Sequence, residues 1–327
     1  MSSAREADRP TSVSIVVVNW NGKAVLEECL ASISRSEYPI QETVVVDNGS
    51  VDGSVEMLEA WCCPPITLLR NARNLGAPVA RNQGIARALK SNPEFVFALD
   101  NDLTIAPDTI HQLVEVMRRD PRIAMAGALI LRHDQPDVIF SAGHVINWTQ
   151  NLVGTLGANR RLKGQFKGIW DVHYVGAGAV LIRTAYIREH GTFDEHYLGY
   201  GYEDTEYGFR ASRLGYRVVC CAEAKVWHRP HSGIGRYSFR KKYLETRNAV
   251  RFIKKYGTIG NWSKYLFFLL AGFVYAFFRE GLLRGNMPGV VGKMRGFMDG
   301  LWNRDELSHR LLNDQPRSKQ MLENTRT

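Results

Sequence analysis

Short apolar runs alternate with segments of helical periodicity through the first hundred residues. β-Branched and aromatic runs at residues 12–18, 43–46, 66–69 and 94–99 predict buried strands. Between them, residues 23–34, 55–61 and 77–90 place apolar side chains at helical spacing. Units of this kind, about 30 residues each, predict an α/β fold whose central sheet is mostly parallel and has helices on both faces.

The pattern after residue 106 is less regular. Strands are expected at residues 124–131, 138–144, 175–183 and 218–221, and helices at 185–189 and 203–214. Residues 154–168 are rich in Gly and Arg and are expected to form a mobile loop.

Polar loops follow each of the first four strands, with the sequences NWNG, DNGSVDGS, NARNLG and DND. In a parallel sheet these loops meet beyond the carboxyl ends of the strands, where ligands bind. Asp100 and Asp102 follow the fourth strand and could together hold a divalent cation, although a solvated turn is the simpler alternative. Asp47 could accept a hydrogen bond from a base or a ribose, whereas Asp52 is interpreted as a helix cap.

Three further positions carry candidate chemistry. Gly76 precedes a helix whose N–H groups could face a phosphate, and Arg81 lies one turn later. Glu203 and Asp204 open a later helix, where the helix dipole alone favours carboxylates but where one could also deprotonate a hydroxyl. The preceding Tyr200 and Tyr202 offer ring faces to a sugar. His228 either completes a metal shell or is structural.

The net charge of +9 is concentrated in one stretch. Residues 225–264 contain eleven Lys and Arg residues against the single acid Glu245. A solvated basic face, an anionic membrane, nucleic acid or a phosphate-rich substrate would each account for it. No nucleic-acid reader motif accompanies the charge, so no nucleic-acid partner is expected.

Two other features bear on location. The five cysteines show no zinc spacing, and the N-terminus lacks the apolar core of a signal peptide, so a cytoplasmic protein with reduced thiols is expected. The longest apolar run, residues 265–278, has 14 residues, whereas a bilayer requires about 20. This run is therefore a buried core helix, an interfacial helix or a helix of a dimer interface.

The chain resembles the inverting family 2 glycosyltransferases of the GT-A fold, close to a bacterial rhamnosyltransferase-like group. The segments that carry the resemblance run in the family's order over residues 12–235 and are SIVVVNWNG, VVVDNGSVDGS, NARNLGAPVARNQGI, FALDND, GAGAVLIR, FDEHYLGYGYEDTEYGFRASRLGYRV and AKVWHRPHSG.

The resemblance implies a Rossmann-like nucleotide-diphospho-sugar transferase fold and a role for each matching residue. Asp204 would be the catalytic base with Glu203 beside it, and Asp100, Asp102 and His228 would hold Mg²⁺ or Mn²⁺. The donor, a nucleoside-diphosphate sugar, would contact Asn19, Asp47, Asn74, Gly76, Arg81, Asp100 and Asn101. The acceptor would be a glycan or a lipid-linked saccharide of cell-surface polysaccharide synthesis. A non-catalytic nucleotide-sugar-binding or regulatory protein of the same fold is the alternative.

This interpretation divides the chain into four parts. Residues 1–11 are expected to be disordered, and residues 12–250 to form the GT-A domain, with a nucleotide-sugar-binding half (12–105) and an acceptor-binding half (106–250). Residues 251–312 would be a helical, membrane-associated extension, and residues 313–327 a disordered tail. The expected location is the cytoplasm, either free or peripheral at the inner face of the membrane, with a homo-oligomer left open.

Overall fold

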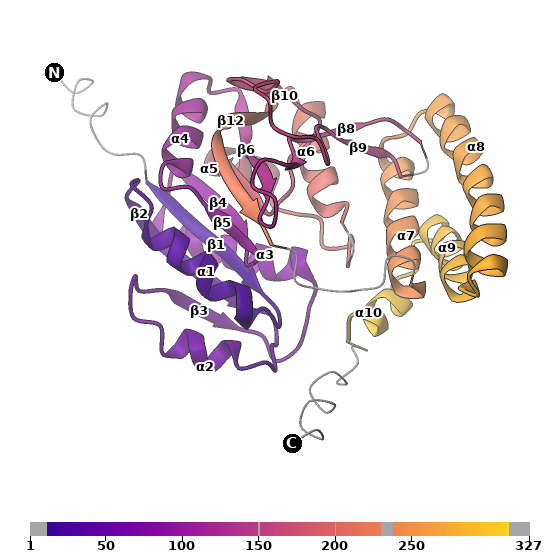
Figure 1. Ribbon diagram of the computed structural model, residues 1–327, viewed down its shortest axis with the longest axis horizontal. Coiled ribbons are helices and arrows are strands. Elements are labelled where there is room, and N and C mark those ends of the chain that lie inside the picture. The colour runs from indigo at the N-terminus through magenta and orange to yellow at the C-terminus, as the bar shows by residue number, and fades with distance from the viewer. Residues whose placement is uncertain (1–11, 150, 200, 230–237, 314–327) are drawn as a thin grey trace.

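A computed structural model describes residues 12–149, 151–199, 201–229 and 238–313 (Figure 1). The N-terminal segment 1–11 and nearly all of the tail expected to be disordered lie outside the described residues. The strands are β1 (Val13–Asn19), β2 (Ile40–Asp47), β3 (Thr67–Arg70), β4 (Phe95–Asp100), β5 (Leu103–Ile105), β6 (Ile123–Arg132), β7 (Ile139–Ser141), β8 (His144–Ile146), β9 (Val153–Thr155), β10 (Ile169–Asp171), β11 (Ala179–Arg183) and β12 (Arg217–His228). The helices are α1 (Lys23–Ser34), α2 (Ser54–Glu59), α3 (Ala77–Ala88), α4 (Thr109–Arg119), α5 (Thr184–His190), α6 (Glu203–Arg213), α7 (Phe239–Tyr256), α8 (Ile259–Ala276), α9 (Met287–Leu301) and α10 (Glu306–Asn313).

One large sheet forms the centre of residues 12–228, the part of the chain expected to be catalytic, which is called the catalytic half below. Its main path runs β10-β12-β6-β11-β4-β1-β2-β3, with β5 paired to β12 and β7 to β6. Strands β1 to β4 are mutually parallel where they pair, and β11 is antiparallel to β4 and β6. The expected mostly parallel α/β sheet is therefore confirmed.

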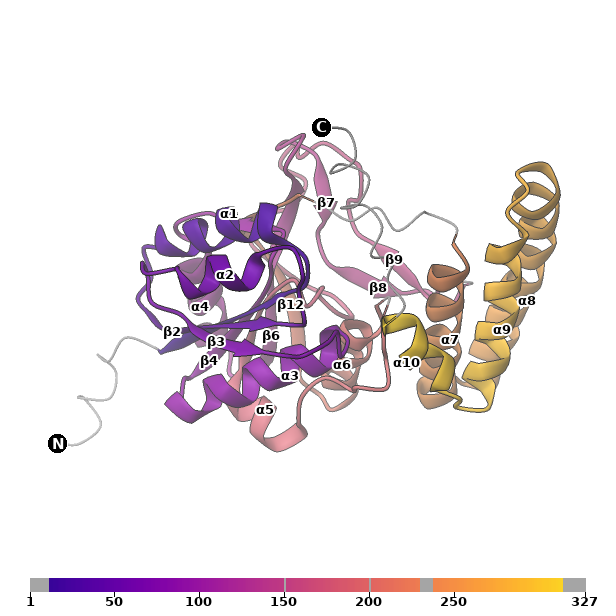
Figure 2. The same cartoon turned by 90° about the horizontal axis from the view of Figure 1, so that it is seen from below.

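Helices cover both faces of this sheet (Figure 2). Alternate residues of β1 point to opposite faces, so that Val13, Ile15 and Val17 pack with α1 and α4, while Val16 packs with α3. This two-sided burial explains why the strands read as continuous apolar runs.

The register of the parallel strands aligns their carboxyl ends. Asn19 lies opposite Asp47, and Val18 lies opposite Asp100. The polar loops that follow β1, β2 and β4 therefore begin at one edge of the sheet, as predicted.

The second half differs from its predicted pattern in several places. Helix α4 was not predicted, and β12 continues to His228 instead of ending near residue 221. The segment expected to be a mobile loop begins inside β9, which pairs with β8. The expected domain boundary at residue 250 falls within α7.

The C-terminal helices form a layer beside the sheet, with α7 between the catalytic half and the α8–α9 pair in both views (Figures 1 and 2). Helices α7 and α9 approach closely because Gly292, Gly296 and Gly300 of α9 lie against the backbone carbonyls of Phe239, Tyr243 and Arg247. A side chain at these positions would collide with the α7 backbone, so the glycines permit the contact.

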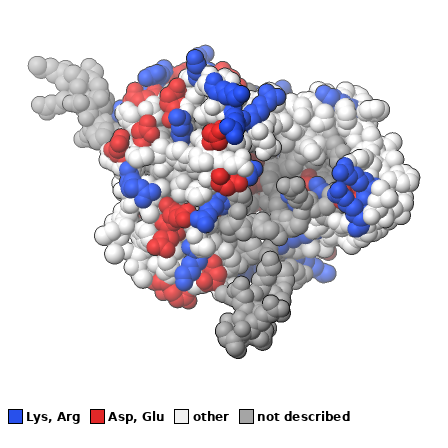
Figure 3. All heavy atoms as spheres, viewed as in Figure 1, with Lys and Arg blue, Asp and Glu red and all other residues white. Residues whose placement is uncertain are grey.

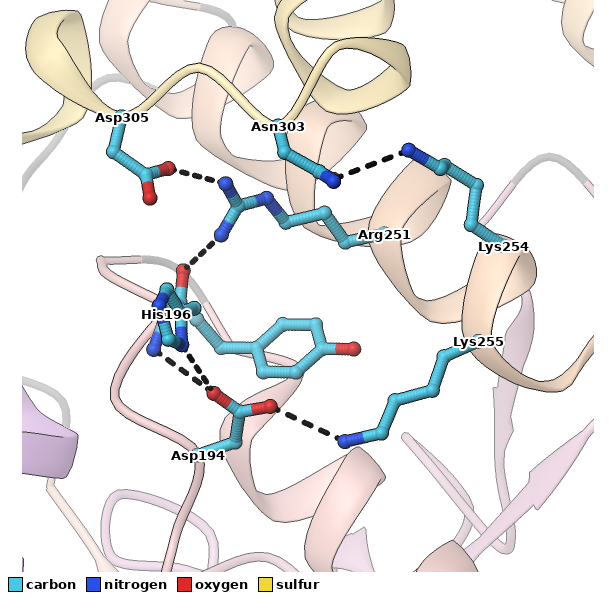
Figure 4. A pocket seen from close by; sticks show the side chains of 8 residues that line it. Asp194, His196, Arg251, Lys254, Lys255, Asn303 and Asp305 are labelled. Atoms are coloured by element: carbon cyan, nitrogen blue, oxygen red, sulfur yellow. Dashed lines mark hydrogen bonds and ion pairs between the residues drawn. The ribbon is translucent and has the colours of Figure 1, made fainter.

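Basic residues of α7 fasten this layer to the catalytic half (Figure 4). Lys255 Nζ lies 3.2 Å from Asp194 and 2.9 Å from the buried Glu206. Arg251 donates to the His196 carbonyl at 3.1 Å and also pairs, within the C-terminal layer, with Asp305. Asp194, Arg251, Lys255 and Asp305 are among the residues that line a polar cavity of about 400 Å³ between α7 and the segments at 194–197 and 303–305. In this part of the 225–264 stretch the basic side chains are thus paired with acids, while Lys254 and Lys255 also remain exposed to solvent.

The apolar run at 265–278 belongs to a longer continuous helix. Helix α8 continues into a π-helical segment, Phe277–Leu283, and together they form one 25-residue helix, Ile259–Leu283, of mean hydropathy 1.7. This length and composition would suffice to cross a membrane. Only 17% of its most apolar window is buried, so the buried-core interpretation is wrong.

Candidate active site

Three predicted donor-binding residues meet where β1, β2 and β4 end. Asn19 is fully buried; its Nδ2 donates to Asp47 Oδ1 at 3.0 Å, and its Oδ1 accepts from Asn101 Nδ2 at 2.6 Å. Asp47 Oδ2 also accepts from the Ser50 N–H at 2.9 Å. The network ties the loop after β2 to the D-x-D loop after β4. These hydrogen bonds hold the loops after β1, β2 and β4 in place at the sheet edge. Direct contact of Asn19, Asp47 and Asn101 with a nucleotide stays a prediction.

Asn74 and Gly76 shape the start of α3. Asn74 Oδ1 accepts from the Gly76 N–H at 2.8 Å and from Asn48 Nδ2 at 3.0 Å. Gly76 adopts a φ of +93°, which an L side chain rarely tolerates. The first N–H groups of α3 consequently open toward the same edge as the D-x-D loop, in the arrangement that suits a phosphate.

Arg81 links the donor edge to the second carboxylate pair. Its side chain is 5% exposed, with Nη2 2.9 Å from Asp100 Oδ1 and Nη1 3.7 Å from Glu203 Oε1. The guanidinium also lies over the Phe193 ring, 5.2 Å from its centroid. A buried, always charged donor thus holds Asp100 in place while the Asp100 side chain stays 42% exposed.

A single tight turn brings Asp100 and Asp204 together. The turn is closed by the Ala179 N–H, which donates to the Gly176 carbonyl at 3.3 Å. A Cβ added to Gly178 would lie 2.7 Å from Asp100 Oδ2, and one added to Gly176 would lie 3.8 Å from Asp204 Oδ2. Since the ends of such a turn lie within about 7 Å of each other, Asp100 and Asp204 both lie against this turn, although they are far apart in the sequence.

Asp204 is half-buried in the first turn of α6. Its Oδ1 accepts from the Thr205 N–H at 2.7 Å, which directs Oδ2 toward Gly176. Beside it, the rings of His144 and Tyr174 stack with centroids 4.5 Å apart. Burial lowers the pKa of His144 and Asp204 opposes this, while burial and then Asp204 raise the pKa of Tyr174. Both rings are therefore neutral at pH 7 beside the carboxylate.

Glu203 differs from its neighbour in environment. It is 7% exposed, and its Oε2 is buried without a hydrogen-bond partner among the described residues. Burial raises the pKa of Glu203 to about 8; Asp204 adds to the rise and Arg81 opposes it. The Glu203 carboxyl is therefore mostly protonated at neutral pH.

Asp102 and His228 face each other across the β5–β12 pairing. Asp102 Oδ2 and His228 Nε2 are 3.1 Å apart, and both side chains are less than a fifth exposed. Within the described ranges no group of three His, Cys, Asp or Glu side chains is arranged around a metal position. Carboxylate and imidazole nevertheless suit Mn²⁺, and the buried His228 Nδ1 has no partner in the described part of the chain. The pair fits a metal whose remaining ligands come from a bound diphosphate.

Several residues of this site were missed in the sequence or assigned another role. Gly176 and Gly178 had a visible signal, because GAG before an apolar strand marks close backbone approach. His144 and Tyr174 had none, since they are brought together by pairing across distant segments. Tyr202 was expected to offer a sugar a ring face, but it is buried and donates to the Asn151 carbonyl at 2.8 Å. Tyr200 lies outside the described residues.

Comparisons with known proteins identify the family of the chain. Residues 14–191, more than half of the chain, match Glycosyl transferase family 2. Among curated proteins, the N-acetylglucosaminyl-diphospho-decaprenol L-rhamnosyltransferase of Mycobacterium tuberculosis is 28% identical over 243 residues, which cover 68% of this chain and 77% of that protein.

Solved structures share the fold at low identity. GalNAc-T7, crystallised with UDP, GalNAc and Mn²⁺, superposes with a TM-score of 0.61 at 17% identity, over 94% of this chain but only 59% of its own length. The mannosyltransferase PcManGT of Pyrobaculum calidifontis, in complex with GDP-Man and Mn²⁺, gives a TM-score of 0.56 at 16% identity, over 91% of this chain and 89% of its own. The predicted GT-A fold is thereby confirmed.

Proposed function

The chain belongs to glycosyl transferase family 2 and is a glycosyltransferase that uses a nucleotide sugar, and on that premise we propose that it transfers the sugar, with inversion, to a hydroxyl of a lipid-linked saccharide. The observation that carries the proposal is the 176–179 turn, against which both Asp204 and Asp100 lie. In the proposed reaction the sugar occupies the gap between these two carboxylates. The Mycobacterium tuberculosis relative is named for a diphospho-decaprenol-linked acceptor, which supports the acceptor class.

The site residues divide the reaction between two sides of this gap. On the acceptor side, Asp204 Oδ2 takes the proton of the attacking hydroxyl as its oxygen bonds to the anomeric carbon. On the donor side, the bond from that carbon to the diphosphate breaks, and the nucleoside diphosphate leaves with the electron pair. One displacement inverts the anomeric centre, and no covalent sugar–enzyme intermediate is needed.

Charged groups stabilise the departing diphosphate. Asp102 and His228, with Asp100, would hold Mg²⁺ or Mn²⁺, which offsets negative charge on the leaving group. Arg81 keeps Asp100 oriented through their ion pair. Because Glu203 is protonated, it does not compete with Asp100 for the positive charge of Arg81. Glu203 is thus a positioning residue, and Asp204 alone is the base.

The exposed apolar surface of the C-terminal layer supports a location at a membrane. Phe267, Leu270, Phe278 and Leu283 are each more than half exposed. The end of the molecule formed by α8 and α9 is mostly uncharged apart from one cluster of basic side chains, whereas acidic and basic side chains mix over the catalytic half (Figure 3). Contiguous exposed apolar patches mark sites of membrane or protein interaction. Because α9 is packed along α7, and α7 is ion-paired to the catalytic half, the layer would lie in the membrane interface instead of crossing it.

The test is transfer by Asp204→Asn. With a panel of nucleotide sugars, Mn²⁺ and an N-acetylglucosaminyl diphospholipid acceptor, we expect the variant to lose about 10²- to 10⁴-fold in kcat and to keep the donor affinity of the unmodified protein. The exposed, ion-paired Asp134→Asn is the matched control. Near-normal turnover by Asp204→Asn would contradict the assignment of the base. An unmodified enzyme that accepts water-soluble glycans but no lipid-linked ones would contradict the acceptor class.

A further inference from the structure

Lys293 of α9 is a buried cation that the proposed chemistry does not use. It is 3% exposed, and its Nζ lies 4.8 Å from the centroid of the Phe273 ring of α8. In the part of the chain that the structure describes, it forms no hydrogen bond or ion pair. Burial, and to a smaller extent Lys242, lower its pKa to about 8, although Glu245 acts in the opposite direction. A buried ammonium group lacking an acceptor is costly, which points to an anion that joins it.

Two more lysines stand beside it on the first turn of α7. Lys242 Nζ lies 2.7 Å from Glu245 Oε2, and Lys241 Nζ lies 3.8 Å from Glu245 Oε1. Gly292, next to Lys293, packs on the Phe239 carbonyl, which brings α9 against this turn. Lys242 and Glu245 are both near enough to Lys293 to influence its pKa. The four side chains carry a formal net charge of +2, which matches in size the negative charge of a diphosphate diester.

An apolar groove begins at this cluster. It lies between α8 and α9, has a volume of about 400 Å³, and is lined by Leu270, Phe273, Phe277, Met294 and Phe297 among other apolar side chains. Phe273 belongs both to the groove and to the surroundings of Lys293. A ligand that followed the groove would therefore need a hydrocarbon chain ending in an anionic group.

The cluster also lies toward the catalytic base. Glu245 is close enough to Tyr202 to contribute to the rise in the pKa of that phenol, as does Tyr265 of α8, although burial is the larger cause. Tyr202 directly precedes Glu203 and Asp204 at the start of α6. The order in space is groove, lysine cluster, Tyr202 and base, which is the order of lipid, diphosphate and sugar in a lipid-linked acceptor.

We infer that Lys241, Lys242 and Lys293 bind the diphosphate of the acceptor and that the α8–α9 groove holds the first part of its hydrocarbon chain. This inference rests on the proposed lipid-linked acceptor and adds to it the residues that select a diphosphate. On binding, the Lys293 ammonium would gain hydrogen bonds to phosphate oxygens, which the Phe273 ring cannot supply. The two negative charges of the diphosphate would balance the formal +2 charge of the cluster.

Farnesyl diphosphate is the probe, with farnesol as its phosphate-free counterpart, and binding is measured by calorimetry on the full chain. Lys293→Met keeps the length and packing of the side chain and removes its charge, and Lys264→Met, at an exposed lysine on α8, is the matched control. We expect Lys293→Met to weaken farnesyl diphosphate binding about tenfold to a hundredfold and to leave farnesol binding unchanged. Its melting temperature should equal or exceed that of the unmodified protein, because a buried unpaired charge is gone.

Kinetics separate this inference from the function on which it rests. In the transfer assay Lys293→Met should raise the KM for the lipid-linked acceptor and leave the KM for the nucleotide sugar unchanged. Equal farnesyl diphosphate affinity in Lys293→Met and the unmodified protein would overturn the inference, as would no binding by the unmodified protein. The inference would also be overturned if Lys293→Met lost binding to phosphatidylglycerol vesicles but kept its affinity for farnesyl diphosphate. That result would indicate that Lys293 binds a lipid headgroup and not the acceptor diphosphate. Failure of the unmodified enzyme to transfer any sugar, with farnesyl diphosphate binding intact, would count against the proposed function instead.

Discussion

Replacing Glu203 by Gln should change how the stability of the protein depends on pH. The native carboxyl has a pKa of about 8, against an ordinary value of 4.5, because it is buried next to Asp204. Between these two values the folded chain holds a proton that the unfolded chain releases. The stabilising contribution of this group is therefore complete below pH 4.5 and is lost as the pH rises through 8.

The size of the effect follows from the difference between the two pKa values. At about 1.4 kcal/mol per pKa unit, the loss across the whole window is on the order of 5 kcal/mol, a large share of a typical domain's stability. Gln resembles the protonated carboxyl in shape and cannot ionise. The variant should thus match the unmodified protein near pH 5 and become more stable than it, by a few kcal/mol, at pH 8.5.

Urea unfolding at several pH values between 5 and 8.5 measures this directly. The exposed Glu37→Gln serves as the control and should follow the unmodified protein throughout. Glu203→Gln should also retain most of its transferase activity at pH 7, in contrast to Asp204→Asn. Parallel stability curves for Glu203→Gln and the unmodified protein would refute the view that Glu203 is neutral in the folded state.

Three other substitutions test separate parts of the structure. Gly178→Ala would place a methyl group 2.7 Å from Asp100 Oδ2 and should lower kcat by about a hundredfold through misplacement of that carboxylate, as initial rates would show; an unchanged kcat would contradict this close contact. His228→Ala should raise the Mn²⁺ concentration needed for half-maximal activity by about tenfold or more, and an unaltered Mn²⁺ titration would remove His228 from the proposed metal site. Gly296→Val would collide with the Tyr243 carbonyl and should cost about 1–3 kcal/mol, seen as a lower melting temperature and faster proteolysis of the C-terminal helices. Gly260→Ala, where a Cβ meets only ordinary contacts, is its control, and equal stability of the two variants would contradict the packing of α9 on α7.

The first four βα units could be predicted because the sequence pattern within each unit is enough to show its strand and its helix. Apolar runs bounded by polar loops marked β1 to β4, and helix α1 has the predicted bounds of Lys23 and Ser34. The placement of Asp47 and Asp100 near one sheet edge followed from that topology alone. Helix α4 was overlooked although Ile110, Leu113, Val114 and Met117 do form a buried face, so its signal was present.

Other features have no local signal. Strands β5, β9 and β10 have three residues each, too few to show a period of two. The contacts of Arg81 with Asp100 and Glu203 join residues up to 122 positions apart, and no spacing predicts them. The basic stretch at 225–264 could not be resolved by counting charges, because pairing with Asp194, Glu206 and Asp305 depends on how α7 docks.

The antiparallel ladder between β5 and β12 has a consequence for redesign. Leu103 lies opposite His228, and the Arg229 N–H donates to the Asp102 carbonyl at 2.9 Å, so main-chain hydrogen bonds fix the spacing of the Asp102 and His228 side chains. Substitutions that replace the side-chain oxygen of Asp102 by a nitrogen, or the reverse at His228, would leave these main-chain hydrogen bonds in place. At the proposed metal site, the preference for harder or softer cations could therefore be tuned by altering these two side chains without rebuilding the loops around them.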